Sequence, residues 1–205
     1  MTFAADLTTL RDPDNNFYLK PDTGSFAIGG WEDGSRGFHL GTPPFSFGRE
    51  LLNPNMERLA LFAEPASTRL PVLNEIGIHT IINGPIPVSA DGEPIIGKIP
   101  DLDNFYVACG FTAGIAASGG AGLAMSNLIL HGDAGMGLWP FDVRRFGRFH
   151  SQPRYLEERA IETYSKYYKI HWPSGCHIRN LRQSSLHHLL AVQHNAVMGR
   201  RFGWE

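Results

Sequence analysis

A strand-like segment that leads directly into a helix of very small residues constrains this chain most. Phe105–Cys109 is a short apolar run typical of a strand, and the Gly110–Gly114 turn that follows carries a glycine at each end. The helix predicted next, which ends near His131, has three interior glycines between residues 119 and 122. Each interior glycine costs a helix about 1 kcal/mol relative to alanine. Such a sequence is expected where the backbone must closely approach a neighbouring element or a flat ligand.

The start of this predicted helix is a candidate binding site. The free N–H groups of a first helical turn point in one direction and favour negative charge, such as a phosphate or the electron-rich edge of a reduced ring cofactor. The segment is not a dinucleotide fingerprint, because GxGxxG followed by a ribose-binding acid is absent. Close packing of the helix on the strand also explains the glycines, and from their spacing alone it is the favoured interpretation.

The rest of the pattern predicts an α+β fold with a mixed or antiparallel sheet. The strands are expected at Phe17–Lys20 and Ser25–Trp31, joined by the turn at 21–24, and at Gly77–Ile82 and Pro94–Ile96, with a turn at Asp91-Gly92 before the last. A helix is expected from Pro54 to Ala63, with the proline in its first turn.

The composition shifts near residues 132–140, and a mostly helical part follows. Arg154–Lys169 has the pattern of a charged amphipathic helix, and Leu186–Val197 that of a short final helix capped by Ser184 or Ser185. We therefore expect a domain boundary near residue 135, with one domain at residues 1–135 and a small helical one at residues 136–205.

Composition and charge exclude several classes of function. The 205-residue chain has a formal net charge of -2 and a pI near 6.5, so it lacks the basic surface expected of a nucleic-acid-binding protein. No apolar run is long enough for a membrane span, and residues 1–11 do not resemble a signal peptide. Cys109, in a strand that looks buried, and Cys176, in a loop, give no disulfide framework. A reducing compartment is expected, either the cytoplasm or the mitochondrial matrix.

The histidines do not predict a metal site. His187, His188 and His194 cluster near the C-terminus, but no pair has the i, i+4 spacing together with a third ligand that zinc requires, so we interpret them as surface residues. His79 is expected on a strand, as a satisfied core or surface residue. Asp91 and Glu93 are explained by turn chemistry. The sequence contains no nucleophile elbow, phosphate loop or HExxH motif.

The order of several segments carries a specific resemblance to a known family. These segments are LRDPD (10–14), FAIGGWE (26–32), INGP (82–85), SADGEPIIG (89–97), FYVACGFTAGIAASGGAG (105–122), ILHG (129–132), FDVRRF (141–146) and GWE (203–205). Together they resemble the dimethylglycine dehydrogenase and sarcosine dehydrogenase family of flavoproteins, and the likeness spans essentially the whole chain.

The resemblance implies a domain organisation and a cofactor. Residues 1–135 would be the C-terminal part of a DAO-type FAD-dependent oxidoreductase domain, which contains the substrate-domain sheet and a glycine-rich helix against FAD. Residues 136–205 would be an incomplete central linker domain, so the chain would be truncated at both ends and would lack the folate-binding region of its relatives. The FAD-contacting positions carried over by the resemblance are Gly110, Phe111, Thr112, Ala113, Gly114 and Ile115. The catalytic residues and any covalent FAD anchor would precede Met1.

The activity implied is oxidative demethylation of an N-methylglycine, sarcosine or dimethylglycine, by hydride transfer from the N-methyl carbon to the flavin. The resulting iminium would be hydrolysed to formaldehyde or captured by folate. The isolated chain would be inactive, and the resemblance does not specify the amine or the electron acceptor. Three alternatives stay open at this point. They are a non-catalytic relative like the pyruvate dehydrogenase phosphatase regulatory subunit, an interaction module, and a fragment without independent function.

Overall fold

The computed structural model describes residues 7–38, 44–48, 50–170, 175, 182–200 and 204–205, and these form an α+β fold. Contacts divide the chain into two compact units. Unit 1 comprises Met1–Pro85 and Tyr164–Trp172, and unit 2 comprises Ile86–Thr163 and Pro173–Glu205. No helix among the described residues combines the length and the apolar character needed to cross a membrane.

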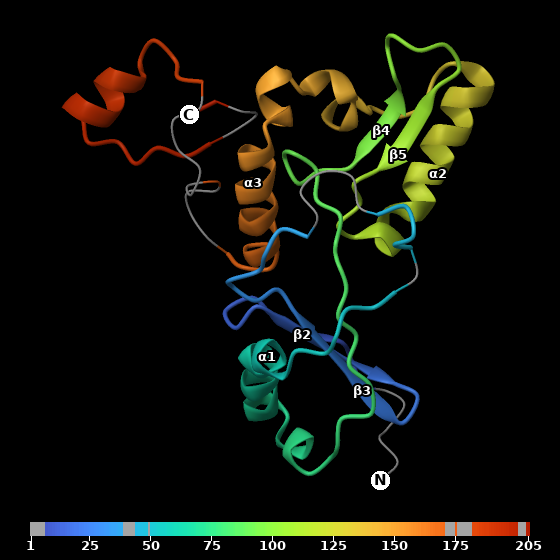
Figure 1. Cartoon of the computed structure of the whole chain (residues 1–205), viewed down its shortest axis with the longest axis vertical. Helices are drawn as coiled ribbons and strands as arrows, with labels where there is room; N and C mark the ends of the chain where they lie inside the picture. Colours follow the sequence, from blue (N-terminus) through green and yellow to red (C-terminus); the bar gives the residue numbers. More distant parts are fainter. Residues whose placement is uncertain (1–6, 39–43, 49, 171–174, 176–181, 201–203) are drawn as a thin grey trace. The chain divides into compact units, whose positions relative to one another are not determined.

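Unit 1 is built on an antiparallel sheet of strands β1 (Leu10–Asp12), β2 (Phe17–Asp22) and β3 (Ser25–Gly30), in that order (Figure 1). The predicted hairpin is confirmed, and Gly24 in its turn has the positive φ of 75° that the turn requires. Helix α1 (Met56–Arg69) packs on β2 and β3. The buried core between sheet and helix comprises Phe17, Leu19 and Ala66, with Phe26, Ile28, Phe62, Leu70 and Leu73 around them.

The predicted helix in unit 1 exists, but its bounds differ from the prediction. Asn55 is the N-cap, because its side chain accepts a hydrogen bond of 2.9 Å from the Arg58 N–H, so Pro54 lies outside the helix. The helix also continues through Pro65 to Arg69 before the short 3₁₀ helix η1 (Pro71–Asn74).

The strand predicted at Gly77–Ile82 is wrong. That segment has no regular secondary structure, and Ile78 and Ile82 are exposed. Its residue pattern suited a strand, but among the described residues no neighbouring strand pairs with its backbone.

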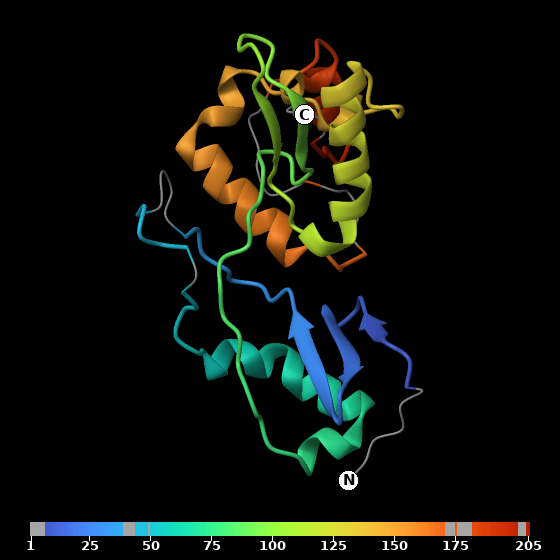
Figure 2. The ribbon, with the colours of Figure 1, turned by 90° about the vertical axis from the view of Figure 1, so that its right-hand side faces the viewer.

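Unit 2 contains the strand–glycine–helix segment. Strands β4 (Ile95–Lys98) and β5 (Tyr106–Cys109) form an antiparallel pair, and helix α2 (Gly114–His131) lies beside it (Figure 2). All three elements were predicted. The expectation that Cys109 is buried is wrong, because its side chain is exposed at the end of the two-stranded sheet. Cys176 lies outside the described residues.

The described residues after α2 are mostly helical where they have regular structure, as predicted. They form the 3₁₀ helices η2 (Trp139–Phe141), η3 (Val143–Arg145) and η4 (Arg148–Ser151), the α-helix α3 (Pro153–Ser165), whose last two residues belong to unit 1, and the π-helix η5 (Leu189–Gln193). Helix α3 therefore ends four residues before the predicted Lys169, and η5 is shorter than the predicted final helix. The predicted serine cap on η5 is wrong, because the helix has no side-chain cap hydrogen bond.

A buried histidine in unit 2 predicts a dependence of stability on pH. His150 is 4% exposed among Phe146, Phe149 and Tyr155, and its Nδ1 accepts a hydrogen bond of 2.9 Å from the Gly147 N–H. Burial lowers the pKa of His150 below its ordinary value of 6.5. As pH falls through about 6.5 the unfolded chain therefore takes up the proton before the folded one, and stability is lost.

The expected result is that the free energy of unfolding is constant above about pH 7.5 and decreases below pH 6.5, by at most about 1.4 kcal/mol per pH unit for this one proton. Urea unfolding of the wild type and of His150→Phe, followed by circular dichroism between pH 8 and 5, measures this decrease. The curve of the variant should be flatter over this interval. Parallel curves for the two proteins would show that His150 does not contribute to the pH dependence of the free energy of unfolding.

Candidate cofactor-contacting site

The turn between β5 and α2 is shaped by a glycine with positive φ. Gly110 has a φ of 72°, and a Cβ built on it would lie 3.4 Å from the Cβ of Ser89. The hydroxyl of Thr112 donates a hydrogen bond of 3.1 Å to the carbonyl of Pro87. The backbone therefore reverses in a conformation that glycine adopts at low cost, while Thr112 and the neighbouring Ser89 fix its direction.

The first turn of α2 presents free backbone donors at the surface. Ala113 is the N-cap, and the helix has no side-chain cap hydrogen bond. The first N–H bonded along the helix is that of Ala117, at 3.2 Å from the carbonyl of Ala113, so the three preceding N–H groups have no acceptor within the helix. Residues 113–116 are exposed, with Ile115 at 95%. This is the arrangement that favours an anionic or electron-rich group.

The interior glycines of α2 are not used for packing within the described part of the chain. A Cβ at Gly119, Gly120 or Gly122 would meet nothing within 4 Å. The helix contacts β4 instead, and Ala124 is its buried residue. The alternative that these glycines serve close packing of the helix on its own strand pair therefore has no support here. They form an open surface that continues from the first turn.

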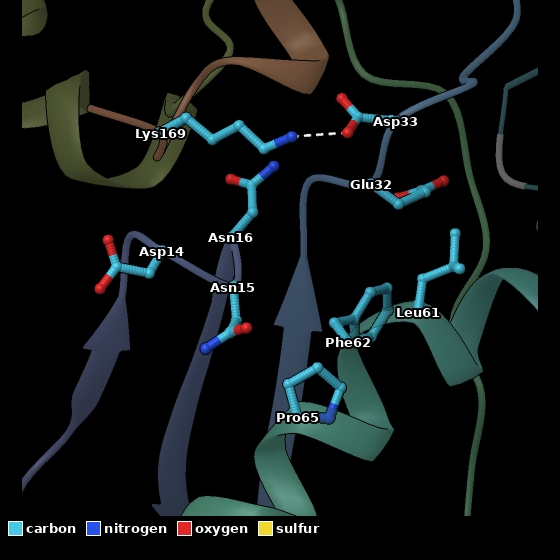
Figure 3. Close-up of a pocket in the computed structure, with 9 residues that line it drawn as sticks. All are labelled: Asp14, Asn15, Asn16, Glu32, Asp33, Leu61, Phe62, Pro65 and Lys169. Carbon is cyan, nitrogen blue, oxygen red and sulfur yellow. Dashed lines mark hydrogen bonds and ion pairs between the residues drawn. The ribbon is translucent and has the colours of Figure 1, made fainter. Parts of the chain in front are cut away.

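Unit 1 holds a separate cavity of about 260 Å³ that the sequence did not suggest (Figure 3). Polar side chains form one part of its lining and an apolar face of α1 the other; these residues are Asp14, Asn15, Asn16, Glu32, Asp33, Leu61, Phe62, Pro65 and Lys169. The ammonium of Lys169 lies 2.5 Å from the carboxylate of Asp33. Because these two residues are 136 positions apart, their proximity gives no local sequence signal.

A buried carboxylate in the lining of this cavity, that of Glu32, already has a partner on each oxygen. Glu32 accepts a hydrogen bond of 2.6 Å from the hydroxyl of Tyr164 and pairs with Arg58 at 3.0 Å. Burial, followed by the hydrogen bond to Glu32, raises the pKa of Tyr164. Tyr164 is therefore a hydrogen-bond donor at all physiological pH values, and the arrangement is a structural anchor rather than an acid–base pair.

The histidines that the sequence singled out do not form a site. His79 is exposed, lies outside any strand and has its Nδ1 2.8 Å from the hydroxyl of Thr80. His188 and His194 are exposed, while His187 lies 3.8 Å from the carboxylate of Glu205. Within the part of the chain that the structure describes, no three His, Cys, Asp or Glu side chains come together in a way that could hold a metal ion.

Comparison with known families gives the class of the protein. Residues 2–128 match the family model described as FAD dependent oxidoreductase, and residues 131–184 match the FAD dependent oxidoreductase central domain. The first match covers more than half of the chain. The chain therefore belongs to the FAD dependent oxidoreductase family.

Curated relatives narrow this class further. The chain is 32% identical to the mitochondrial sarcosine dehydrogenase of Homo sapiens, over 98% of this chain and 22% of the relative. It is 31% identical to the mitochondrial dimethylglycine dehydrogenase of Rattus norvegicus, over 98% of this chain and 24% of the relative. It is 29% identical to the 4-methylaminobutanoate oxidase (formaldehyde-forming) of Paenarthrobacter nicotinovorans, over 91% of this chain and 23% of the relative. The chain thus spans about a quarter of the length of these relatives.

The residues at the start of α2 are compatible with one edge of FAD. The uncapped donors of the first turn suit the electron-rich edge of the flavin. The exposed glycine face beyond them leaves room for a flat ring, because no described atom lies where a Cβ would project. The dinucleotide fingerprint that would bind the pyrophosphate is absent from the chain. The residues present thus fit part of the cofactor.

Proposed function

We propose that this chain contributes the flavin-facing part of an enzyme that oxidatively demethylates N-methyl amines, with N-methylglycines such as sarcosine and dimethylglycine as substrates. The residues that face the flavin are Gly110, Phe111, Thr112, Ala113, Gly114 and Ile115. The observation that carries the proposal is the uncapped, exposed first turn of α2 directly after the positive-φ Gly110, in a chain of the FAD dependent oxidoreductase family.

The chemistry divides between cofactor and chain. When bound, FAD would supply the two-electron acceptor for the hydride lost by the N-methyl carbon of the amine, and the resulting iminium would be hydrolysed to formaldehyde and the demethylated amine or captured by folate. The contribution of this chain is electrostatic. The N–H groups of residues 114–116 would stabilise negative charge on the reduced cofactor, and the exposed side chain of Ile115 would be free to contact it.

The organisation and compartment of the whole protein belong to the same proposal. We place the boundary between the oxidoreductase and central domains near residue 135, and a folate-binding region in the whole protein would accept the one-carbon unit. Two of the relatives are named mitochondrial, which supports the mitochondrial matrix over the cytoplasm for this chain. The regulatory alternative is not favoured, because the two relatives above that are more than 30% identical to the chain are named sarcosine dehydrogenase and dimethylglycine dehydrogenase.

The substitution Gly114→Leu tests the proposed site. A Cβ at Gly114 would lie 3.7 Å from the Cβ of Phe111, which is ordinary contact, so the fold accepts a side chain here. A leucine would nevertheless project from the first turn of α2, where the flavin is proposed to lie. We expect the wild-type protein to quench the fluorescence of added FAD saturably, and Gly114→Leu to raise the dissociation constant at least about tenfold, which is about 1.4 kcal/mol.

Gly77→Leu is the matched control, because Gly77 is an exposed glycine of unit 1 with open space around its Cβ position. It should bind FAD as the wild type does, and all three proteins should have the same thermal midpoint by circular dichroism. Equal FAD affinity of Gly114→Leu and Gly77→Leu would remove the first turn of α2 from the site. A wild-type protein that leaves FAD fluorescence unchanged would contradict flavin binding by this chain.

A further inference from the structure

Arg145 binds the loop around Asp91, for which the local sequence predicts only a turn. Its guanidinium forms a bidentate pair with the carboxylate of Asp91, with Nε 2.7 Å from Oδ2 and Nη2 3.0 Å from Oδ1. The same Nη2 lies 2.9 Å from the carbonyl oxygens of Glu93 and Pro94. The Arg145 side chain is 9% exposed and that of Asp91 17%. A planar, buried fork of this kind fixes both the distance and the orientation of the loop from Ser89 to Pro94, here called the 89–94 loop.

The 89–94 loop is fixed internally and by a second arginine. The hydroxyl of Ser89 donates to the carbonyl of Glu93 at 2.5 Å and accepts from the Gly92 N–H at 3.1 Å. Arg159, on α3, donates to the carbonyl of Asp91 at 2.7 Å. Burial alone would raise the pKa of the Asp91 carboxyl, but the hydrogen bonds and charge of Arg145 outweigh it and keep that pKa below its ordinary value. The carboxylate is therefore ionised at neutral pH and the pair is intact.

This loop supports the turn that is proposed to face the flavin. The strand register places Ile95 opposite Cys109, so the 89–94 loop and Gly110 lie at the same end of the β4–β5 pair (Figure 1). The Cβ position of Gly110 is 3.4 Å from Ser89, and Thr112 is hydrogen-bonded to Pro87. A displacement of the 89–94 loop would therefore remove the surface on which the Gly110–Thr112 turn rests.

The two arginines that bind the 89–94 loop lie in a different family-model match from the loop itself. Arg145 and Arg159 fall within residues 131–184, which match the central domain, whereas the 89–94 loop and the turn fall within residues 2–128. We infer that Arg145 is a positioning residue for flavin binding, through which the central-domain segment holds the 89–94 loop and thereby the Gly110–Thr112 turn. This inference rests on the proposed function for its flavin readout, while the positioning itself is measurable without flavin.

Arg145→Gln and Arg144→Gln form a matched pair of variants. Arg144 is adjacent in sequence and also pairs with an aspartate, but its side chain is 73% exposed and its guanidinium binds Asp142 rather than the loop. Amide hydrogen exchange of the FAD-free protein should accelerate at least fivefold in Arg145→Gln at Gly92 and Glu93, whose N–H groups are hydrogen-bonded within the loop. It should also accelerate at Ala117, whose N–H bonds the carbonyl of Ala113 next to the turn. The rates should stay at wild-type values in Arg144→Gln.

The flavin readouts separate positioning from general stability. The dissociation constant for FAD should rise about tenfold in Arg145→Gln and be unchanged in Arg144→Gln. At saturating FAD, the visible absorption spectrum of Arg145→Gln should shift toward that of free FAD. Arg145→Lys keeps the positive charge but loses the bidentate fork. It should therefore restore part of the FAD affinity and part of the bound-FAD absorption spectrum.

The outcomes distinguish this inference from the proposed function. A wild-type exchange rate at Ala117 in Arg145→Gln would overturn the positioning role, whatever the flavin result. A wild-type protein without FAD affinity, combined with accelerated exchange in Arg145→Gln, would overturn the proposed function and leave only a structural connection. Arg145→Gln could lose protection from hydrogen exchange throughout unit 2. In that case Asp91→Asn tests the positioning role by the same criteria. This substitution removes the negative charge that pairs with Arg145 but keeps the size of the side chain and an acceptor oxygen.

Discussion

Replacing Trp31 with alanine should lower the free energy of unfolding of unit 1 by about 3–5 kcal/mol. Trp31 is 8% exposed, and its ring lies 4.4 Å from that of Tyr167 and 5.1 Å from that of Tyr164, measured between centroids. Its removal leaves a cavity where the end of β3 meets residues 164–168, which follow far later in the chain. A loss of this size is a large fraction of the roughly 5–15 kcal/mol that stabilises an ordinary domain.

Trp139→Ala is the control, because Trp139 is 73% exposed and a surface substitution should change stability by no more than about 0.5 kcal/mol. Urea unfolding followed by circular dichroism compares the two variants without relying on tryptophan fluorescence. Hydrogen exchange should show that Trp31→Ala exposes the backbone of residues 164–168, whose Ser165 carbonyl accepts a hydrogen bond of 2.9 Å from Asn16. A Trp31→Ala variant as stable as Trp139→Ala would mean that this aromatic cluster does not hold unit 1 together.

Elements with local signals could be predicted from the sequence. The β2–β3 hairpin has its turn residues between two strand-like runs, and α2 begins and ends next to glycines with recognisable roles. The strand predicted at Gly77–Ile82 failed because strand formation needs a partner, and the local pattern does not contain one. Helix α1 was predicted to end at Ala63, whereas it continues through Pro65 to Arg69, which the local pattern does not indicate.

The candidate site could be predicted only where its residues are contiguous. Gly110–Ile115 is one segment, so the resemblance located it, although contact with flavin stays a prediction. Asp91 was interpreted as a turn residue because its partner Arg145 is 54 positions away. The local sequence pattern does not predict that Asp91 and Arg145 are in contact. The same limit applies to Lys169 and Asp33 in the cavity of unit 1, since long-range ion pairs are set by the fold rather than by spacing.

Glu162→Ala should destabilise unit 2 by about 3–5 kcal/mol, because it leaves buried arginines without their counter-ion. The carboxylate of Glu162 lies 2.7 Å from Arg200 and 3.1 Å from Arg159, and the three side chains are 3%, 5% and 14% exposed, respectively. Two guanidinium groups thus share one carboxylate, and burial, followed by the nearby charge of Arg200, lowers the pKa of Arg159. Without Glu162 the two positive charges would face each other in a poorly solvated environment.

Glu158→Ala provides the comparison on the same helix. Glu158 pairs with Arg154 at the i, i+4 spacing, but Arg154 is 89% exposed, and such a surface pair contributes only about 0.3–0.5 kcal/mol. Urea unfolding at low and high salt should show a small, salt-sensitive loss for Glu158→Ala and a large loss for Glu162→Ala that salt changes little. Glu162→Gln keeps an acceptor oxygen but not the charge, so its loss of free energy of unfolding should lie between those of Glu158→Ala and Glu162→Ala. A loss below about 1 kcal/mol in Glu162→Ala would mean that water reaches the two arginines and that their burial does not isolate the charge.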